Sequence, residues 1–266
     1  MTAIRLCVAG ADGRMGSTFL KEAALRRNIQ VVGVLTAKAS PNRGKRLGDL
    51  GLSPPDLVLL GPADLKVAVS GAEIFVSFTE PSADVTNVPR AVELGKKVII
   101  GTTGFTGEQR KRLEEAIRDS VPAVIAPNFS IGVNMLYRIL EVAKDFPPDY
   151  DFSVFEVHHT GKADAPSGTA NNIAAILKEA RGYSQTVYGR SGISKRDKKE
   201  LEVLAARVGG VPGIHDILIA GQHEMIRIEH TAFSRSVFAQ GALLAAEWLA
   251  RQHKPGIYTM SDVLFS

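Results

Sequence analysis

The sequence predicts an α/β fold in two parts, a parallel sheet with helices on both faces and then an α+β part with a mixed sheet. Two observations indicate this division. Over residues 4–126, short apolar runs alternate with helical patterns, which is typical of parallel strands joined by crossover helices. Beyond residue 200, strand-like runs follow one another without long helices between them, which favours an antiparallel or mixed sheet.

The expected elements of the first part follow from its apolar runs and its charged helical stretches. A loop is expected over residues 39–56, which are rich in proline, glycine and basic groups. We expect strands at 4–9, 31–35, 57–60, 74–78, 97–100 and 123–126, and helices at 15–27, 83–94 and 107–119.

The second part begins with a helix over residues 132–144 that ends before Pro147, because proline cannot continue a helix. A last helix over 238–251 is expected to return to the first part. We therefore predict a first domain of residues 1–127 with 237–266, and a second domain of residues 128–236. The other elements expected after residue 150 are strands at 151–155, 202–208, 216–220 and 224–231, a helix at 170–181 and a polar loop at 190–199.

Composition narrows the class of protein. Hydrophobic residues make up 45% of the chain and charged residues 23%, enough for a sizeable core, and no apolar run reaches the roughly 18 to 20 residues of a membrane span. The net charge of +4 is scattered, so we expect no nucleic-acid or membrane partner and a preference for anionic small molecules. With one cysteine, Cys7, and no signal peptide before the first strand, we expect a cytoplasmic protein with a buried thiol.

A glycine-rich run joins the first expected strand to the first expected helix. Gly10 permits the tight turn, Gly13 lets the backbone approach a pyrophosphate, and Gly16 lets helix and strand pack closely. The helix N-terminus and Arg14 add positive charge for the phosphates. A tight turn without a ligand is the alternative, but the position after the first strand of a βαβ pattern predicts a Rossmann-like dinucleotide-binding domain.

The second strand carries a signal for the cofactor's identity. An acidic residue that would grip the ribose of NAD is expected near its end, yet residues 33–40 contain no Asp or Glu. They contain Lys38, and the following loop adds Arg43, Lys45 and Arg46. Cations in place of an acid favour a 2′-phosphate, so we predict NADPH in preference to NADH. The alternative is that Lys38 is a solvated loop lysine.

Two further loops follow strands of the same predicted sheet. Ligands of open α/β sheets bind outside the carboxyl ends of the strands, so both loops are placed to reach the nicotinamide end of a dinucleotide. Ordinary turn chemistry of glycine and asparagine explains each loop equally well. The residues concerned are Gly101, Thr102 and Thr103 after one strand, and Ala126, Pro127, Asn128 and Phe129 after the other.

Residues 156–170 concentrate polar chemistry between a strand and a helix. Histidine is the side chain suited to proton transfer near neutral pH, which makes His158 a candidate, and His159 and Lys162 add cationic donors. Ser167 is placed to cap the helix, leaving N–H groups at Gly168 and Thr169 for a carboxylate.

This polar segment has two other interpretations, a metal site and a capped helix with incidental polar neighbours. Adjacent histidines in an extended segment point opposite ways, so no metal is predicted. Asp164 receives no separate role. The remaining histidines are also given none, since such groups are more often surface or satisfied interior residues; they are His215, His223, His230 and His253.

Taken together, the motifs resemble those of the 4-hydroxy-tetrahydrodipicolinate reductases, also called dihydrodipicolinate reductases. The resemblance extends over nearly the whole chain, and the string from His158 to Thr169 is its most specific part. The motifs that carry it are Gly10–Gly16, Gly101–Phe105, Asn128–Asn134, Glu156–Ala170, His230–Arg235 and the helix over 241–249.

The resemblance implies a role for each matching residue. His158 would donate or accept a proton, Lys162 would be the catalytic acid, His159 would bind substrate, and Gly168 with Thr169 would hold a carboxylate. It also implies a homotetramer whose interface lies in the middle domain. The residues implied to contact the dinucleotide are Gly10, Ala11, Asp12, Gly13, Arg14, Met15, Gly101, Thr102, Thr103, Ala126, Pro127, Asn128 and Phe129.

The activity implied is the NAD(P)H-dependent reduction of 4-hydroxy-tetrahydrodipicolinate, a dicarboxylate, to tetrahydrodipicolinate with release of water, in lysine biosynthesis through diaminopimelate. Some family members carry Glu-Arg after the second strand where this chain has Ala37-Lys38, in line with the predicted NADPH preference. Two alternatives stay open. Another nicotinamide-dependent reductase on this fold explains the glycine loop but not the paired histidines, and a non-catalytic dinucleotide sensor has no need of the polar segment.

Overall fold

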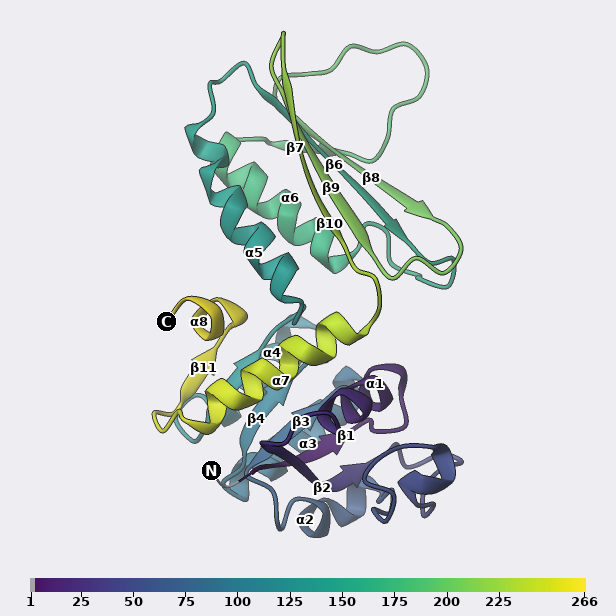
Figure 1. Ribbon diagram of the computed structural model, residues 1–266. Coiled ribbons are helices and arrows are strands. Elements are labelled where there is room, and N and C mark those ends of the chain that lie inside the picture. The colour runs from purple at the N-terminus through teal and green to yellow at the C-terminus, as the bar shows by residue number, and fades with distance from the viewer. Residues whose placement is uncertain (1–2) are drawn as a thin grey trace. The chain divides into compact units, whose positions relative to one another are not determined.

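The computed structural model describes residues 3–266 and divides into two compact units (Figure 1). Unit 1 runs to Ser130 and continues over Ser236–Ser266, and unit 2 is Ile131–Arg235. The second unit is therefore an insertion within the first. The sequence-based division, after residue 127 and again after 236, falls within a few residues of these positions.

Unit 1 is built on a parallel sheet in the order β11-β5-β4-β3-β1-β2. Its inner strands are buried on both faces, which explains why they read as continuous apolar runs rather than as alternating patterns. The strands are β1 (Ile4–Ala9), β2 (Ile29–Leu35), β3 (Ile74–Ser77), β4 (Lys97–Ile100), β5 (Pro122–Ile125) and β11 (Gly256–Tyr258).

Helices cover both faces of this sheet (Figure 1). One core contains Phe19 of α1 (Arg14–Ala23), Ala242 of α7 (Ser236–Ala250) and Met260 of α8 (Met260–Phe265). The other contains residues of α2 (Leu65–Ala68), α3 (Pro81–Glu93) and α4 (Gly107–Ile117). This layering confirms the predicted Rossmann-like first part.

The strand order of unit 1 reverses at β1. The chain passes from β1 to β2 on one side, and β3 lies on the other side of β1. In open α/β sheets, ligands bind outside the carboxyl ends of the strands at such a switch point. The glycine-rich run leaves β1 at this place.

Unit 2 contains a mixed sheet in the order β10-β9-β6-β8-β7, as predicted for the second part. β6 pairs with β8 in parallel and with β9 antiparallel. The helices are α5 (Ile131–Leu140) and α6 (Gly168–Arg181). The 3₁₀ turn η3 (Glu141–Asp145) directly follows α5. The strands are β6 (Asp151–His158), β7 (Gln185–Val187), β8 (Glu200–Arg207), β9 (Ile214–Ala220) and β10 (Met225–Thr231).

Side chains of β6 alternate strictly between the two faces of this sheet. Phe152 and Val154 point into the core formed with α5 and α6, whereas Phe155 points to the other face and is 37% exposed. Because the alternation has a period of two, Glu156 and His158 lie on the core side. Two polar groups are thereby placed at the end of a buried strand face.

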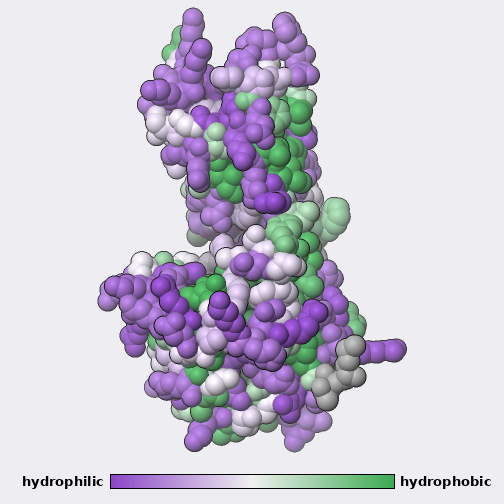
Figure 2. All heavy atoms as spheres, turned by 90° about the vertical axis from the view of Figure 1, so that its left-hand side faces the viewer, coloured by the Kyte–Doolittle hydropathy of each residue, from purple (hydrophilic) through white to green (hydrophobic). Residues whose placement is uncertain are grey.

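Hydrophobic surface is also present on the helical side of unit 2 (Figure 2). Four partly exposed apolar residues follow one another along α5 and η3, namely Ile131, Met135, Ile139 and Val142. No helix among residues 3–266 is long and apolar enough to cross a membrane.

Several expected boundaries were wrong. α1 ends at Ala23 rather than at residue 27, because the chain must turn to begin β2 at Ile29. The expected strand at 57–60 makes only isolated bridges, from Val58 to Arg46 and from Leu60 to Leu35. β6 continues to His158, three residues beyond its expected end, and the tail after residue 251 contains β11 and α8, which were not predicted.

Candidate active site

The glycine loop of unit 1 has no room for side chains at two of its glycines. Gly10 has a φ of +75°, and a Cβ there would lie 2.3 Å from the carbonyl oxygen of Phe78. A Cβ at Gly16 would lie 2.0 Å from the carbonyl oxygen of Gly10. The first turn of α1 thus packs directly on the strand end, as the spacing predicts.

The N-terminus of α1 fits a pyrophosphate. The helix begins at Arg14, and its N-cap, Gly13, provides no side-chain hydrogen bond within the described chain. The first N–H groups of the helix therefore donate no hydrogen bond to an N-cap side chain, and they lie at its positive dipole end. Such a terminus binds an anion by its backbone, which is what a dinucleotide requires.

Asp12 joins the glycine loop to the loop after β2. Its carboxylate accepts hydrogen bonds from Thr36 Oγ1 at 2.5 Å, Ser40 Oγ at 2.6 Å and Asn42 Nδ2 at 3.2 Å. Burial raises the pKa of Asp12, but these three hydrogen bonds outweigh it and hold the pKa below its ordinary value. The side chain of Asp12 thus holds the loop that carries Lys38, whose own side chain is exposed.

The loops after β4 and β5 are held mainly by internal contacts. Thr102 is buried, and its hydroxyl accepts a hydrogen bond from the N–H of Thr79 at 3.1 Å. Asn128 Oδ1 accepts one from the N–H of Ser130 at 2.8 Å. The ring of Phe129 is buried in the core, edge-on to Phe78. Any contact of Phe129 with the cofactor would therefore be made mainly by its backbone atoms.

Glu156 contacts three other groups of the polar cluster, although its side chain is completely buried. One oxygen, Oε1, accepts the N–H of Ser167 at 3.0 Å and Arg207 Nη2 at 3.1 Å. The other oxygen lies 2.5 Å from His158 Nδ1. Burial raises the pKa of Glu156, yet the hydrogen bonds from His158 and Ser167 and the charge of His158 lower it to about 2. The carboxylate is therefore ionised throughout the neutral range.

Lys162 has a partner that the sequence did not indicate. Its Nζ lies 2.8 and 3.0 Å from the two carboxylate oxygens of Asp164. Burial raises the pKa of Asp164, but the hydrogen bond and the charge of Lys162 lower it further than burial raises it. Arg207 donates to the backbone oxygens of both residues, at 3.3 Å to that of Lys162. Asp164, left without a role above, thus holds the predicted acid.

The start of α6 is capped as predicted. Ser167 Oγ accepts the N–H of Ala170 at 3.1 Å, and Gly168 and Thr169 form the first turn of the helix. Gly168 is exposed and Thr169 half-buried, so this turn is accessible from outside. His159, the first residue beyond β6, is half-buried.

His215 was assigned no role, and the structure places it in the cluster. It is buried on β9, its Nε2 lies 3.2 Å from Ser167 Oγ, and its ring centroid lies 5.2 Å from that of His158. Burial, and then the charge of His158, lower the pKa of His215 to about 3, so its ring is neutral at physiological pH. His215 and Arg207 come from other strands, so no local motif pointed to them.

Three buried groups of this cluster are of the types that bind metals, namely Glu156, His158 and His215, and their ligand atoms lie within 4.8 Å of one another. Both oxygens of Glu156 already contact protein groups, and one of these is a guanidinium. The guanidinium of Arg207, 3.1 Å from the carboxylate of Glu156, would repel a metal cation bound there. The contacts therefore favour a proton-handling cluster over a metal site.

Comparison with known proteins identifies the family. The N-terminal domain model of dihydrodipicolinate reductase matches residues 4–129, and the C-terminal domain model of the same enzyme matches residues 132–264. The chain belongs to the dihydrodipicolinate reductase family. The predicted resemblance is thereby confirmed over almost the whole sequence.

Relatives in the family align over their full length. The 4-hydroxy-tetrahydrodipicolinate reductase of Methanosarcina barkeri is 43% identical over 265 residues, which cover 98% of this chain and 99% of the relative. The enzymes of the same name from Methanopyrus kandleri and Syntrophus aciditrophicus are 38% and 36% identical, each over 98% of this chain and 97% and 98% of the relative.

Solved structures support the fold. A dipicolinate-bound dihydrodipicolinate reductase from Paenisporosarcina sp. TG-14 superimposes with a TM-score of 0.76 at 22% identity, covering 99% of this chain and all of the other. An amine dehydrogenase from Mycobacterium smegmatis gives a TM-score of 0.65 at 15% identity, covering 97% and 95%. The fold is thus shared beyond the family, which is why a general reductase was a reasonable alternative.

Proposed function

We propose that this chain is a 4-hydroxy-tetrahydrodipicolinate reductase, which reduces its substrate to tetrahydrodipicolinate with release of water in cytoplasmic lysine biosynthesis. The observation that carries the proposal is the polar cluster of unit 2, in which one buried carboxylate contacts a histidine and a capped helix start, and reaches the loop of Lys162 through Arg207. The names of the full-length relatives support the same reaction.

In this proposal, the first turn of α6 binds a carboxylate of the substrate. Ser167 caps the helix through the N–H of Ala170, and Gly168 and Thr169 form the first turn at the positive end of a 14-residue helix. His159, adjacent on the chain to the end of β6, supplies a further donor. A dicarboxylate suits this arrangement, because anions are stabilised at helix N-termini.

His158 and Lys162 handle the proton. Reduction of a conjugated imine builds negative charge toward the ring nitrogen, so a nearby cationic donor lowers the barrier. Lys162, held by Asp164, is the acid that protonates or polarises that nitrogen. His158 exchanges a proton through the ring nitrogen that does not face Glu156.

Unit 1 holds the dinucleotide in this proposal, with the pyrophosphate at the N-terminus of α1 and the nicotinamide toward the loops after β4 and β5. When bound, the nicotinamide supplies the hydride. The glycine loop excludes side chains where the phosphates approach, and Asp12 fixes the loop that faces the adenosine ribose. Unit 2, at residues 128–236 in the predicted division, binds the substrate.

The reaction is tested by following NADPH oxidation with freshly prepared 4-hydroxy-tetrahydrodipicolinate. Turnover of this substrate, with none of aspartate semialdehyde or simple imino acids, supports the proposal. Turnover of an imino acid or semialdehyde alone would point to another reductase of this fold. Binding of NADPH without turnover of any of these substrates would point to a dinucleotide sensor.

We further propose NADPH as the preferred reductant. Lys38 is exposed on the loop after β2, and that loop carries no acid near the strand end to repel a 2′-phosphate. We expect kcat/KM to be higher with NADPH than with NADH, and replacement of Lys38 by alanine to reduce this ratio, because a charge-assisted contact to phosphate is lost. Steady-state rates with both cofactors measure it. A clear NADH preference in the unaltered enzyme would contradict this assignment.

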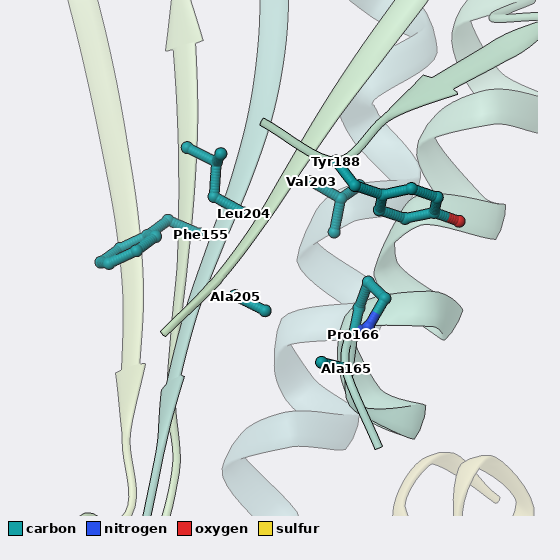
Figure 3. Close-up of a pocket in the computed structure, with 7 residues that line it drawn as sticks. All are labelled: Phe155, Ala165, Pro166, Tyr188, Val203, Leu204 and Ala205. Atoms are coloured by element: carbon teal, nitrogen blue, oxygen red, sulfur yellow. The ribbon is translucent and has the colours of Figure 1, made fainter. Parts of the chain in front are cut away.

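We also propose a homotetramer that assembles through unit 2, as the family resemblance implies. The sheet face opposite α5 and α6 carries Phe155, Leu204 and Leu218, none of them fully buried. A groove of about 400 Å³ is formed partly by this face (Figure 3). Phe155, Tyr188, Leu204 and Pro166 are among the residues that line this groove.

Replacing Phe155 by aspartate is expected to shift the enzyme to smaller species, because a charge on an apolar interface is costly to desolvate. Light scattering after size-exclusion chromatography measures the mass. The matched control is Leu25→Asp, which alters an exposed leucine of unit 1. An unaltered mass for the Phe155 variant would exclude this face as the interface.

A further inference from the structure

Glu156 contacts each of the three parts of the substrate site. It lies 2.5 Å from the Nδ1 of His158, it accepts the N–H of Ser167 at the start of α6, and it pairs with Arg207. Arg207 in turn holds the backbone of the Lys162 loop, through the carbonyl oxygens of Lys162 and Asp164. A single carboxylate therefore connects the proton-exchanging ring, the acid-bearing loop and the carboxylate cradle.

We infer that Glu156, held in place by Arg207, is a positioning residue that fixes the tautomer and orientation of His158 and stabilises its protonated form. This inference rests on the proposed function, since it assigns a role within that reaction. Glu156 itself has no path to the substrate, because its side chain is fully buried. It acts through the ring of His158 and through the loop that Arg207 holds.

The geometry selects one nitrogen of His158 for chemistry. With Nδ1 against the carboxylate, the neutral ring carries its proton on Nδ1 and presents Nε2 as the reactive atom. Gly213 lies against that atom, since a Cβ built there would be 3.1 Å from Nε2. A glycine at this place leaves the space around Nε2 open, as proton exchange requires.

Among the charged groups around His158, Glu156 is the anion that contacts the imidazole ring. Arg207 on β8 and Lys162 on the loop after β6 are cations, and Asp164 pairs with Lys162 and also interacts with the charge of Arg207. His215 on β9 is neutral, and burial also lowers the pKa of His230 on β10. Glu156 is thus the anion that balances the cluster on the side of His158. Without it, a proton on His158 would lose the anion that contacts its ring.

The test compares Glu156→Gln with the unaltered enzyme across pH. We expect kcat to fall about 10- to 100-fold and the pH dependence of kcat to change, because the opposite charge in contact with the His158 ring is lost. Affinity for NADPH should stay unchanged, because unit 1 is not altered. The matched control is Glu202→Gln, which removes a carboxylate from β8 of the same sheet. A pH profile that superimposes on that of the unaltered enzyme would overturn the inference.

Rescue and spectroscopy separate positioning from folding. Glu156→Asp keeps the charge but moves it away from the His158 ring. Its pH profile should therefore lie between that of the unaltered enzyme and that of Glu156→Gln. Nuclear magnetic resonance of ¹⁵N-histidine reads the tautomer of His158 directly in the unaltered protein, without any turnover. An Nδ1-protonated neutral ring supports the inference even if the proposed substrate is not reduced. An Nε2-protonated ring would refute it even if Glu156→Gln fails to fold.

Discussion

Replacing Lys162 by alanine is expected to lower kcat by about 10²- to 10⁴-fold, the usual contribution of a positioned general acid. NADPH should still bind with unchanged affinity, because the glycine loop and α1 belong to unit 1. Stopped-flow or steady-state oxidation of NADPH measures the rate, and fluorescence titration of the bound cofactor measures the affinity. A rate equal to that of the unaltered enzyme would remove Lys162 from the mechanism.

A second variant shows which property of Lys162 matters. Lys162→Arg retains the charge and the pairing with Asp164, but a guanidinium does not release its proton near neutral pH. We therefore expect kcat to remain low in this variant while KM returns toward its original value. Lys198→Ala, in the exposed polar loop of unit 2, is the control for removing a lysine elsewhere. Full recovery of kcat by arginine would mean that electrostatic polarisation, not proton donation, is the role of Lys162.

Replacing Gly16 by alanine is expected to destabilise unit 1 and to weaken cofactor binding together. The added Cβ would meet backbone atoms, at 2.0 Å from the oxygen and 2.7 Å from the carbonyl carbon of Gly10, so α1 must move away from β1. Overpacking of this kind typically costs about 1–3 kcal/mol. The displaced helix terminus should also lose about tenfold or more in affinity for NADPH, equivalent to roughly 1.4 kcal/mol. Thermal unfolding and cofactor titration measure the two effects.

Gly107→Ala provides the matched control, because a Cβ at Gly107 meets no atom within 4 Å at the exposed start of α4. This change should leave stability equal or raise it by about 0.4–1 kcal/mol, through the reduced freedom of the unfolded chain. If both variants bind NADPH equally well, close packing of α1 on β1 is not what forms the phosphate site.

Much of unit 1 could be predicted because its elements carry strong local signals. β1 and β4 have the predicted bounds, since each is an apolar run enclosed by polar or glycine-rich turns. Thr106 begins α4 with a capping box that its sequence displays. β11 has only three residues and forms by pairing with the open edge of β5. Its own sequence carries no strand signal.

The candidate site divides in the same way. His158, Lys162 and the Ser167 cap lie in one continuous segment, so their chemistry was visible in the sequence. Arg207 and His215 reach the cluster only through strand register, in which Arg207 pairs with His158 and His215 with Glu156. A reader of the sequence alone does not know that register. The role of Asp164 was not predicted for another reason. Its side chain pairs with Lys162, two residues earlier, and no motif indicates that contact.

The insertion of unit 2 within unit 1 has a consequence for how the chain matures. One core of unit 1 includes residues of α7 and α8, which follow the whole of unit 2 in the sequence. A ribosome therefore releases all of unit 2, with its own core of α5, α6 and the mixed sheet, before the first unit can close. During synthesis, the dinucleotide-binding half should stay open on one face, exposed to chaperones and proteases, until the final thirty or so residues emerge.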